Sequence, residues 1–111
     1  MAGTLEAAAR KIETIIDGES VSSLNLYILG NDDQSHDCRP FAIIENVRTD
    51  EAHRGRGYAT ANLTRAEAIA REAGCYKIML CTGSSREEVH QLYHNAGYSS
   101  DVKTCYCKSL E

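Results

Sequence analysis

Long apolar runs are absent from the sequence, and none approaches the roughly 20 residues that cross a bilayer. The first ten residues, Met1 to Arg10, contain Glu6 and no extended apolar stretch, which argues against a secretory signal. Repeats, linkers and low-complexity segments are also absent. The chain has 111 residues, 42% hydrophobic and 25% charged, which is ordinary globular composition with room for one core. We therefore expect one soluble domain over residues 1–111 and no membrane partner.

A broad basic surface is missing as well. The formal net charge is −4, which excludes wholesale binding to nucleic acid because such binding needs a wide positive field. Positive charge is nevertheless concentrated in one short region, at Arg48, Arg54, Arg56 and Arg65. This distribution is compatible with a local site for a small anion.

No two cysteines have the C-x-x-C spacing of a zinc or redox motif. The five cysteines are an odd number, and without a secretory signal this favours reduced thiols in the cytoplasm. Zinc binding by Cys105 and Cys107 is a weaker interpretation than their burial as small hydrophobes. His90 and His94 lie one helical turn apart but lack the glutamate of H-E-x-x-H, so we expect surface histidines and no metal site.

Apolar spacing and glycine positions predict an element order of α-β-β-α-β-α-β. Short connections followed by β-α-β crossovers indicate an α/β (α+β) fold with a mixed sheet and helices packed on it. Gly18 is interpreted as the stop of the first helix, and the polar stretch Gly30–Arg39 as a loop between paired strands. Helices are expected over Thr4–Ile16, from the residue after Gly57 to about Ala73, and over about Arg86–Ala96, and strands over Val21–Leu29, Phe41–Thr49, Cys75–Cys81 and Lys103–Lys108.

A glycine-bearing turn with two arginines, Arg54-Gly55-Arg56-Gly57, leads into the long helix. The first N–H groups of a helix have no partner within it, and the helix dipole adds positive charge there. Glycines allow a ligand to approach the backbone closely, and arginines can fork onto phosphate oxygens. The turn therefore suits a pyrophosphate, although a plain turn with solvated arginines remains the alternative.

Two common phosphate motifs are absent from this turn. No Gly-Lys-Ser/Thr follows it, which argues against a Walker loop and disfavours a nucleotide phosphate-binding protein. The third glycine of the dinucleotide fingerprint is also missing after Gly55 and Gly57.

Segments on either side of the turn carry a resemblance to a known family. Arg54-x-x-Gly57-x-Ala59 resembles the R/Q-x-x-G-x-G/A signature of the GNAT superfamily of acyl-CoA N-acyltransferases. Ile44–Val47 and Lys77–Leu80 resemble strands of that family, and Leu92–Tyr98 resembles its "fYeklGF" segment. The resemblance covers about residues 41–108. It implies a mixed, mostly antiparallel sheet with a central, splayed pair of parallel strands and helices on both faces.

The resemblance also implies how acetyl-CoA would bind. The pantetheine arm would lie between the strands Phe41–Thr49 and Cys75–Cys81, and Ser85 and Leu92 would border the rest of the cosubstrate. Backbone groups of Val47 and Thr49 would hold the arm. The pyrophosphate would be held by backbone N–H groups of Arg54, Gly55, Arg56, Gly57, Tyr58, Ala59 and Thr60.

Two residues are candidates for catalysis. Tyr93 matches the family tyrosine near the thioester sulfur, which implies a proton or hydrogen bond given to the departing thiolate. A phenol of pKa about 10 is a weaker acid than a thiol of about 8.5, so hydrogen bonding is at least as plausible as proton transfer. A role in the core alone stays open for Tyr93. Glu45 lies in an apolar strand, where burial would raise its pKa toward that of a general base, with a structural ion pair as an equal alternative.

Carbonyl polarisation by a backbone N–H near Val47 would complete the chemistry. The expected function is acetyl transfer from acetyl-CoA to a primary amine on a small molecule or peptide, with no metal. Family members are usually longer, and the resemblance implies that this chain lacks their first strand and helix. Three arrangements remain open: a minimal enzyme, a homodimer that covers the exposed sheet edge, and a non-catalytic CoA-binding or assembly module.

Overall fold

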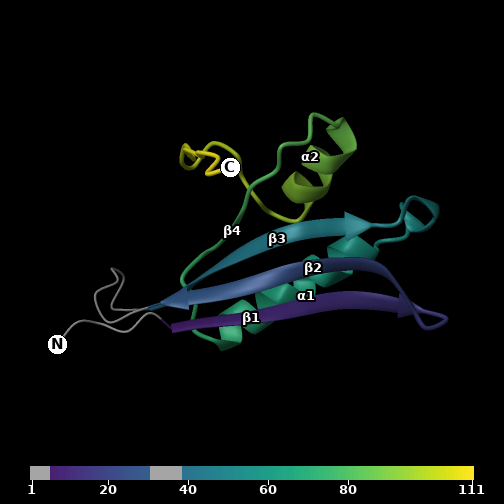
Figure 1. Ribbon diagram of the computed structural model, residues 1–111, viewed down its shortest axis with the longest axis horizontal. Coiled ribbons are helices and arrows are strands. Elements are labelled where there is room, and N and C mark those ends of the chain that lie inside the picture. The colour runs from purple at the N-terminus through teal and green to yellow at the C-terminus, as the bar shows by residue number, and fades with distance from the viewer. Residues whose placement is uncertain (1–5, 31–38) are drawn as a thin grey trace.

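The computed structural model describes residues 6–30 and 39–111. Their strands form one mixed sheet in the order β1-β2-β3-β4, as Figure 1 shows. Neighbours β1, β2 and β3 are antiparallel, and β3 and β4 are parallel. The predicted α/β fold class is therefore confirmed. The elements are β1 (Glu6–Ile16), β2 (Glu19–Gly30), β3 (Phe41–Thr49), the short 3-10 helix η1 (Glu51–His53), α1 (Tyr58–Glu72), β4 (Ile78–Leu80) and α2 (Glu87–Asn95).

The first element is a strand, so the helix predicted over Thr4–Ile16 is wrong. Asp17 and Gly18 do not end a helix but form the tight turn between β1 and β2, with φ angles of 50° and 81°. Positive φ at both positions is the geometry of a type I′ hairpin, whose twist matches that of the paired strands. Because β1 pairs with β2 along all of its 11 residues, this pairing overrides the helical spacing of the apolar residues.

The middle of the chain agrees with the sequence analysis. The predicted strands at Val21–Leu29 and Phe41–Thr49 are β2 and β3, and the predicted long helix is α1. Most of the loop predicted over Gly30–Arg39 lies outside the described residues. Neither described helix is long and apolar enough to cross a bilayer.

The last part of the chain differs from the prediction. The strand expected over Cys75–Cys81 is shortened to Ile78–Leu80, and Lys103–Lys108 forms no strand. As a result, the parallel pair of β3 and β4 lies at one end of the described sheet and not at its centre. The alternation of polar and apolar residues over Lys103–Lys108 gives no strand here because these side chains are all exposed and bury nothing.

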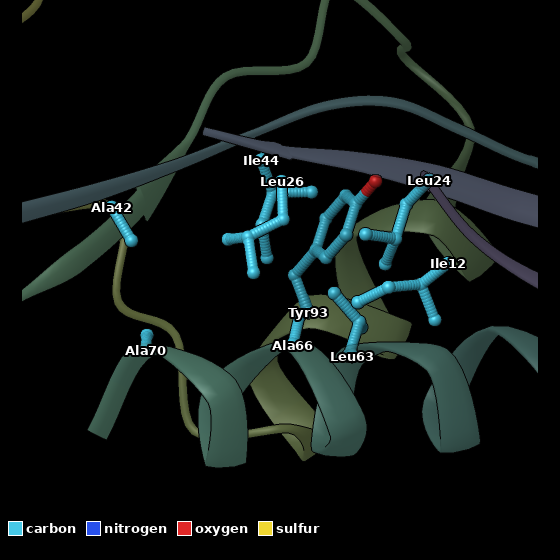
Figure 2. Close-up of a cluster of buried hydrophobic side chains, with 9 residues drawn as sticks. All are labelled: Ile12, Leu24, Leu26, Ala42, Ile44, Leu63, Ala66, Ala70 and Tyr93. Atoms are coloured by element: carbon cyan, nitrogen blue, oxygen red, sulfur yellow. The ribbon is translucent and has the colours of Figure 1, made fainter. Parts of the chain in front are cut away.

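The core lies between one face of the sheet and the helices. Register places Ile12 opposite Leu24 and Ile44 opposite Leu26, so these side chains share that face. Helix α1 covers them, and Figure 2 shows the Tyr93 ring of α2 pointing into the same space. Both helices thus contribute to one buried cluster, whereas helices on both faces were expected. The buried members are Ile12, Leu24, Leu26, Ala42, Ile44, Leu63, Ala66, Ala70 and Tyr93.

Candidate cofactor site at the end of strand β3

Strands β3 and β4 separate at a backbone irregularity. Their parallel pairing runs only from Ala42 opposite Ile78 to Ile44 opposite Leu80. Just beyond, the register between β2 and β3 shifts, because Asn25 pairs with Glu45 while Ser23 pairs with Arg48. One residue of β2 therefore faces two of β3, which defines a β-bulge and bends the strand.

Asn46 forms this bulge. Its φ of 56° lies in the left-handed region, which asparagine tolerates better than most residues. The extra residue interrupts the alternation of inward and outward side chains along β3. As a result, Val47 is the next residue after Ile44 whose side chain packs against the core. Strand β3 thereby diverges from β4 while its inner face stays apolar, and this is the splayed parallel pair that the resemblance implied.

The turn after β3 presents a row of unused amides. The N–H of Asp50 donates to the Val21 carbonyl at 2.8 Å, and the N–H of His53 donates to the Asp50 carbonyl at 2.8 Å. The N–H of Arg54 makes a long contact of 3.4 Å with the Glu51 carbonyl. The next N–H along the backbone with an acceptor is that of Ala61, which donates to the Gly57 carbonyl at 3.0 Å. Among the described residues, the N–H groups of residues 55–60 thus have no acceptor.

Two glycines give this turn its shape. Gly55 and Gly57 have φ angles of 77° and 81°, a region that L-residues enter only with strain. A Cβ at either position would meet no atom within 4 Å, so the space beside both glycines is open. The amides lie at the start of α1, where the helix dipole adds positive charge. The turn can therefore accept an anion such as a pyrophosphate.

The arginines around the turn differ in their contacts. Arg48 is held by Asp50, with an Nη1–Oδ1 distance of 2.7 Å, and by Ser20. Arg54 donates from Nε to the Thr49 carbonyl at 3.3 Å and so bridges the turn. Arg56 is exposed and makes no ion pair with a described residue. The guanidinium of Arg56 is thus available to a ligand.

A buried polar chain ties α1 to three strands. Asn62 accepts a hydrogen bond from the Thr14 hydroxyl at 3.3 Å and donates to the Ser22 hydroxyl at 3.2 Å. Ser22 in turn donates to the Arg48 carbonyl at 3.0 Å and contacts the Thr49 hydroxyl at 2.8 Å. Because Ser22 and Asn62 are buried, each needs these partners. These hydrogen bonds fix the N-terminal part of α1 relative to the end of β3.

Tyr93 combines a core ring with an unpaired hydroxyl. The residue is 9% exposed and lies edge-on to Tyr98, with ring centroids 6.4 Å apart. No described residue hydrogen-bonds its Oη, and this atom is not fully sealed from solvent. Figure 2 shows the ring beside Ile44, the last β3 residue that pairs with β4. Desolvation by burial raises the pKa of Tyr93, which favours hydrogen-bond donation over proton transfer.

Glu45 does not have the environment that its sequence context suggested. Its side chain is exposed, so the desolvation expected to make it a base is absent, and the prediction of a buried carboxylate is wrong. The strand is apolar on its inner face only, and Glu45 lies on the opposite face from Ile44. Val47 and Thr49 follow it on β3, both half-buried, where their backbone groups border the point of divergence.

The remaining candidates lie in the segment after β4. Ser85 is exposed and Leu92 is half-buried against the core. Neither serine of the loop caps α2 at its N-cap position, which is Arg86, although the Ser84 hydroxyl accepts the Arg86 N–H at 3.1 Å. His90 contacts the Ser84 carbonyl at 2.7 Å, which gives it a structural partner.

Sequence reasoning missed two residues that shape the site. Asn46 was given no role, although asparagine before an exposed turn is a known candidate for positive φ. Asn62 was also passed over, although a polar residue beside the inner stripe of an amphipathic helix indicates a buried hydrogen bond. His53, beside the phosphate turn, has an Nδ1 atom that is buried without a hydrogen-bond partner among the described residues.

Comparison with known proteins adds to this geometry. The chain matches the family model of the acetyltransferase (GNAT) family over residues 8–98. A solved structure described as "Putative acetyltransferase from Agrobacterium tumefaciens str. C58" is 33% identical, with a TM-score of 0.81, and the match covers 91% of this chain and 69% of that one. No curated protein sequence matches the chain.

Two further solved structures share the fold at lower identity. Glucosamine-6-phosphate N-acetyltransferase from Arabidopsis thaliana is 20% identical, with a TM-score of 0.77, and the match covers 95% of this chain and 67% of that one. Ribosomal-protein-alanine N-acetyltransferase from Brucella melitensis biovar Abortus 2308 is 20% identical, with a TM-score of 0.75 and coverage of 92% and 72%. At this identity the two likenesses concern the fold alone.

Proposed function

We propose, from the premise that this chain belongs to the acetyltransferase (GNAT) family, that it transfers an acetyl group from acetyl-CoA to a primary amine. The transfer proceeds by direct attack of the amine on the thioester. The observation that carries this proposal is the row of unpaired amides over residues 55–60, placed at the helix start that follows the diverging strand. Family membership supports the acetyltransferase class, and the acceptor and the mechanism are our proposal.

The proposed cosubstrate fits the residues that are present. The amides from Gly55 to Thr60 would donate to the pyrophosphate, and the exposed guanidinium of Arg56 would add a charge-assisted contact. The pantetheine arm would extend along β3 past Val47 and Thr49, where β4 no longer pairs. Ser85 and Leu92 would border it from the segment after β4.

Tyr93 would act on the leaving group. As the amine attacks, negative charge builds first on the thioester oxygen and then on the departing sulfur. A backbone N–H near Val47 would stabilise the oxygen. The unpaired Tyr93 hydroxyl would donate a hydrogen bond to the sulfur, because its raised pKa keeps the phenol protonated.

Glu45 would accept the proton of the attacking amine. It lies on the face of β3 opposite the core, so Glu45 would act on the amine from one face of the strand and Tyr93 would act on the leaving sulfur from the other. An exposed carboxylate at this position can take up the amine proton through water. Exchange of Glu45 for glutamine should lower kcat without changing the affinity for CoA, because the substitution leaves the amides of residues 55–60 intact.

An assay of CoA release tests the function. The purified protein is incubated with acetyl-CoA and a panel of amines: an amino sugar, a peptide with an N-terminal alanine, a lysine peptide and a polyamine. Free thiol should appear with at least one of them. Tyr93→Phe should reduce kcat at least tenfold and leave CoA affinity nearly unchanged. If CoA raises the melting temperature while no amine releases thiol, the protein is a CoA-binding module and our proposal fails.

The exposed edge of the sheet suggests that two copies associate. Strand β1 has a pairing partner on one side only among the described strands. In antiparallel pairing of two copies centred on Ile12, Lys11 would lie opposite Glu13 of the other copy, which favours this register. We propose that two copies form this homodimer. We also propose that the protein works in a reducing compartment such as the cytoplasm, in line with the free thiols of the described cysteines. Sedimentation of the wild type and of a Lys11→Glu variant tests the dimer.

A further inference from the structure

Two cysteines that lie far apart in the sequence meet at the end of β4. The Sγ of Cys81, the residue directly after β4, lies 3.7 Å from the Sγ of Cys105, and the Cys81 thiol donates a hydrogen bond to it. Both residues are exposed, so small molecules in solution can reach the sulfurs. Two reachable sulfurs at this distance need little movement to form a covalent bond.

The contact joins a segment without regular structure to the sheet. Residues 99–111 are exposed and form no helix or strand, and Tyr106 beside Cys105 is 95% exposed. Figure 1 shows this yellow segment lying near the end of β4. Because the side chains of residues 99–111 are exposed, packing does little to fix the position of this segment. A bond between the two sulfurs would therefore fix it.

The surroundings of Cys81 favour its protonated thiol. The pKa of Cys81 is raised, first by its hydrogen bond to Cys105, then by partial desolvation and by the nearby charges of Cys105 and Glu45. Glu45 is thus close enough to affect Cys81, which places the pair beside the point where β3 and β4 diverge.

We propose that Cys81 and Cys105 are a site of reversible oxidation, at which a disulfide fixes residues 99–111 to the end of β4. The oxidant is a small disulfide such as glutathione disulfide. One cysteine thiolate attacks a sulfur of glutathione disulfide, which gives a mixed disulfide and releases one glutathione. The second cysteine thiolate then attacks the protein sulfur of the mixed disulfide and displaces the second glutathione. Overall, two protein thiols are oxidised and one glutathione disulfide is reduced to two thiols.

Peptide mapping tests this proposal independently of acetyl transfer. The full chain is treated with glutathione disulfide, blocked with an alkylating agent and digested with trypsin without reduction. The expected product is a cross-link between the peptide Ile78–Arg86 and the peptide Thr104–Lys108, which disappears on reduction. Because Cys105 and Cys107 share the second peptide, Cys107→Ser and Cys105→Ser are compared as matched variants.

The two variants give opposite expected results. Cys107→Ser should form the cross-link to the same extent as the wild type, and Cys105→Ser should lose it at least tenfold. The cross-linked wild type should also melt at a higher temperature than its reduced form, because the bond restrains the unfolded chain. The proposal is overturned if the wild type stops at the glutathione adduct, if Cys105→Ser cross-links as well through Cys107, or if cross-linking lowers the melting temperature.

Discussion

Exchange of Gly57 for alanine tests the proposed phosphate site separately from the stability of the fold. Gly57 stands at the start of α1 with a φ of 81°, and a Cβ built there meets no atom within 4 Å. The substitution therefore causes backbone strain and no clash. An L-residue in this region costs about 1–2 kcal/mol, and the smaller entropy of the unfolded alanine chain returns about 0.4–1 kcal/mol. The net loss of about 1 kcal/mol should lower the melting temperature by about 4–8 °C.

The effect on CoA binding should be larger than this strain suggests. The new methyl group would occupy the open space beside Gly57, and it would keep a phosphate from approaching the backbone closely. Loss of one hydrogen bond to a charged phosphate costs about 1.5–3 kcal/mol, which corresponds to a loss of affinity of at least about tenfold. Titration calorimetry with CoA measures this change directly, and a thermal melt of the same sample measures the stability.

Gly74 provides the matched control. It follows the C-cap of α1, has a φ of 83° and would also meet no atom within 4 Å with a Cβ. Gly74→Ala should therefore lower the melting temperature by a similar amount and leave CoA affinity within twofold of the wild type. Equal CoA affinity in Gly57→Ala and the wild type would refute the assignment of the phosphate site. An equal loss in both variants would show that the effect reports general destabilisation.

Three other substitutions test the parts that support the site. Asn46→Val should destabilise the protein by about 1–2 kcal/mol in urea, since a β-branched residue resists the positive φ of the bulge, while Asn46→Gly should be tolerated. Asn62→Leu should cost about 1–3 kcal/mol, because Ser22 loses a buried partner, and a smaller loss would show that water replaces the amide. Burial and the Glu67 carboxylate raise the pKa of Tyr98, so the folded state holds the phenol proton more tightly than the unfolded state. Stability should therefore fall as pH rises above about 10, and Tyr98→Phe should reduce that fall in urea titrations.

The sequence predicted the position of the glycine-bearing turn well because the signals for such a turn are local. Gly55 and Gly57 adopt the positive φ angles that only glycine enters freely. Helix α1 begins directly after Gly57, where the charged stretch of the sequence ends. The same reasoning failed at Asp17 and Gly18. There the Asp-Gly pair is a strong hairpin signal, but the helical spacing of the preceding apolar residues led to the wrong interpretation of a helix end.

Burial was harder to predict than the elements themselves. Glu45 lies between apolar neighbours in sequence, yet it is exposed because the outer face of β3 at this point is not covered by a described element. The register with β2 and the position of α1 decide which face is buried, and both depend on contacts between distant parts of the chain. Tyr93 shows the same dependence, since its ring enters the core on the side of α1 although α2 lies far along the sequence.

The bulge at Asn46 depends both on local sequence signals and on contacts between distant parts of the chain. It is a local conformation, but it matters only because β4 stops pairing with β3 just before it. If β3 kept its regular alternation without the bulge, the Asn46 side chain would turn inward in place of Val47, and an asparagine would enter the apolar core. The bulge keeps Val47 against the core and bends β3 shortly before the glycine-bearing turn. The bend of β3 and the proposed phosphate turn therefore depend on each other, and a substitution that straightens β3 should weaken CoA binding even though it leaves every residue of the turn unchanged.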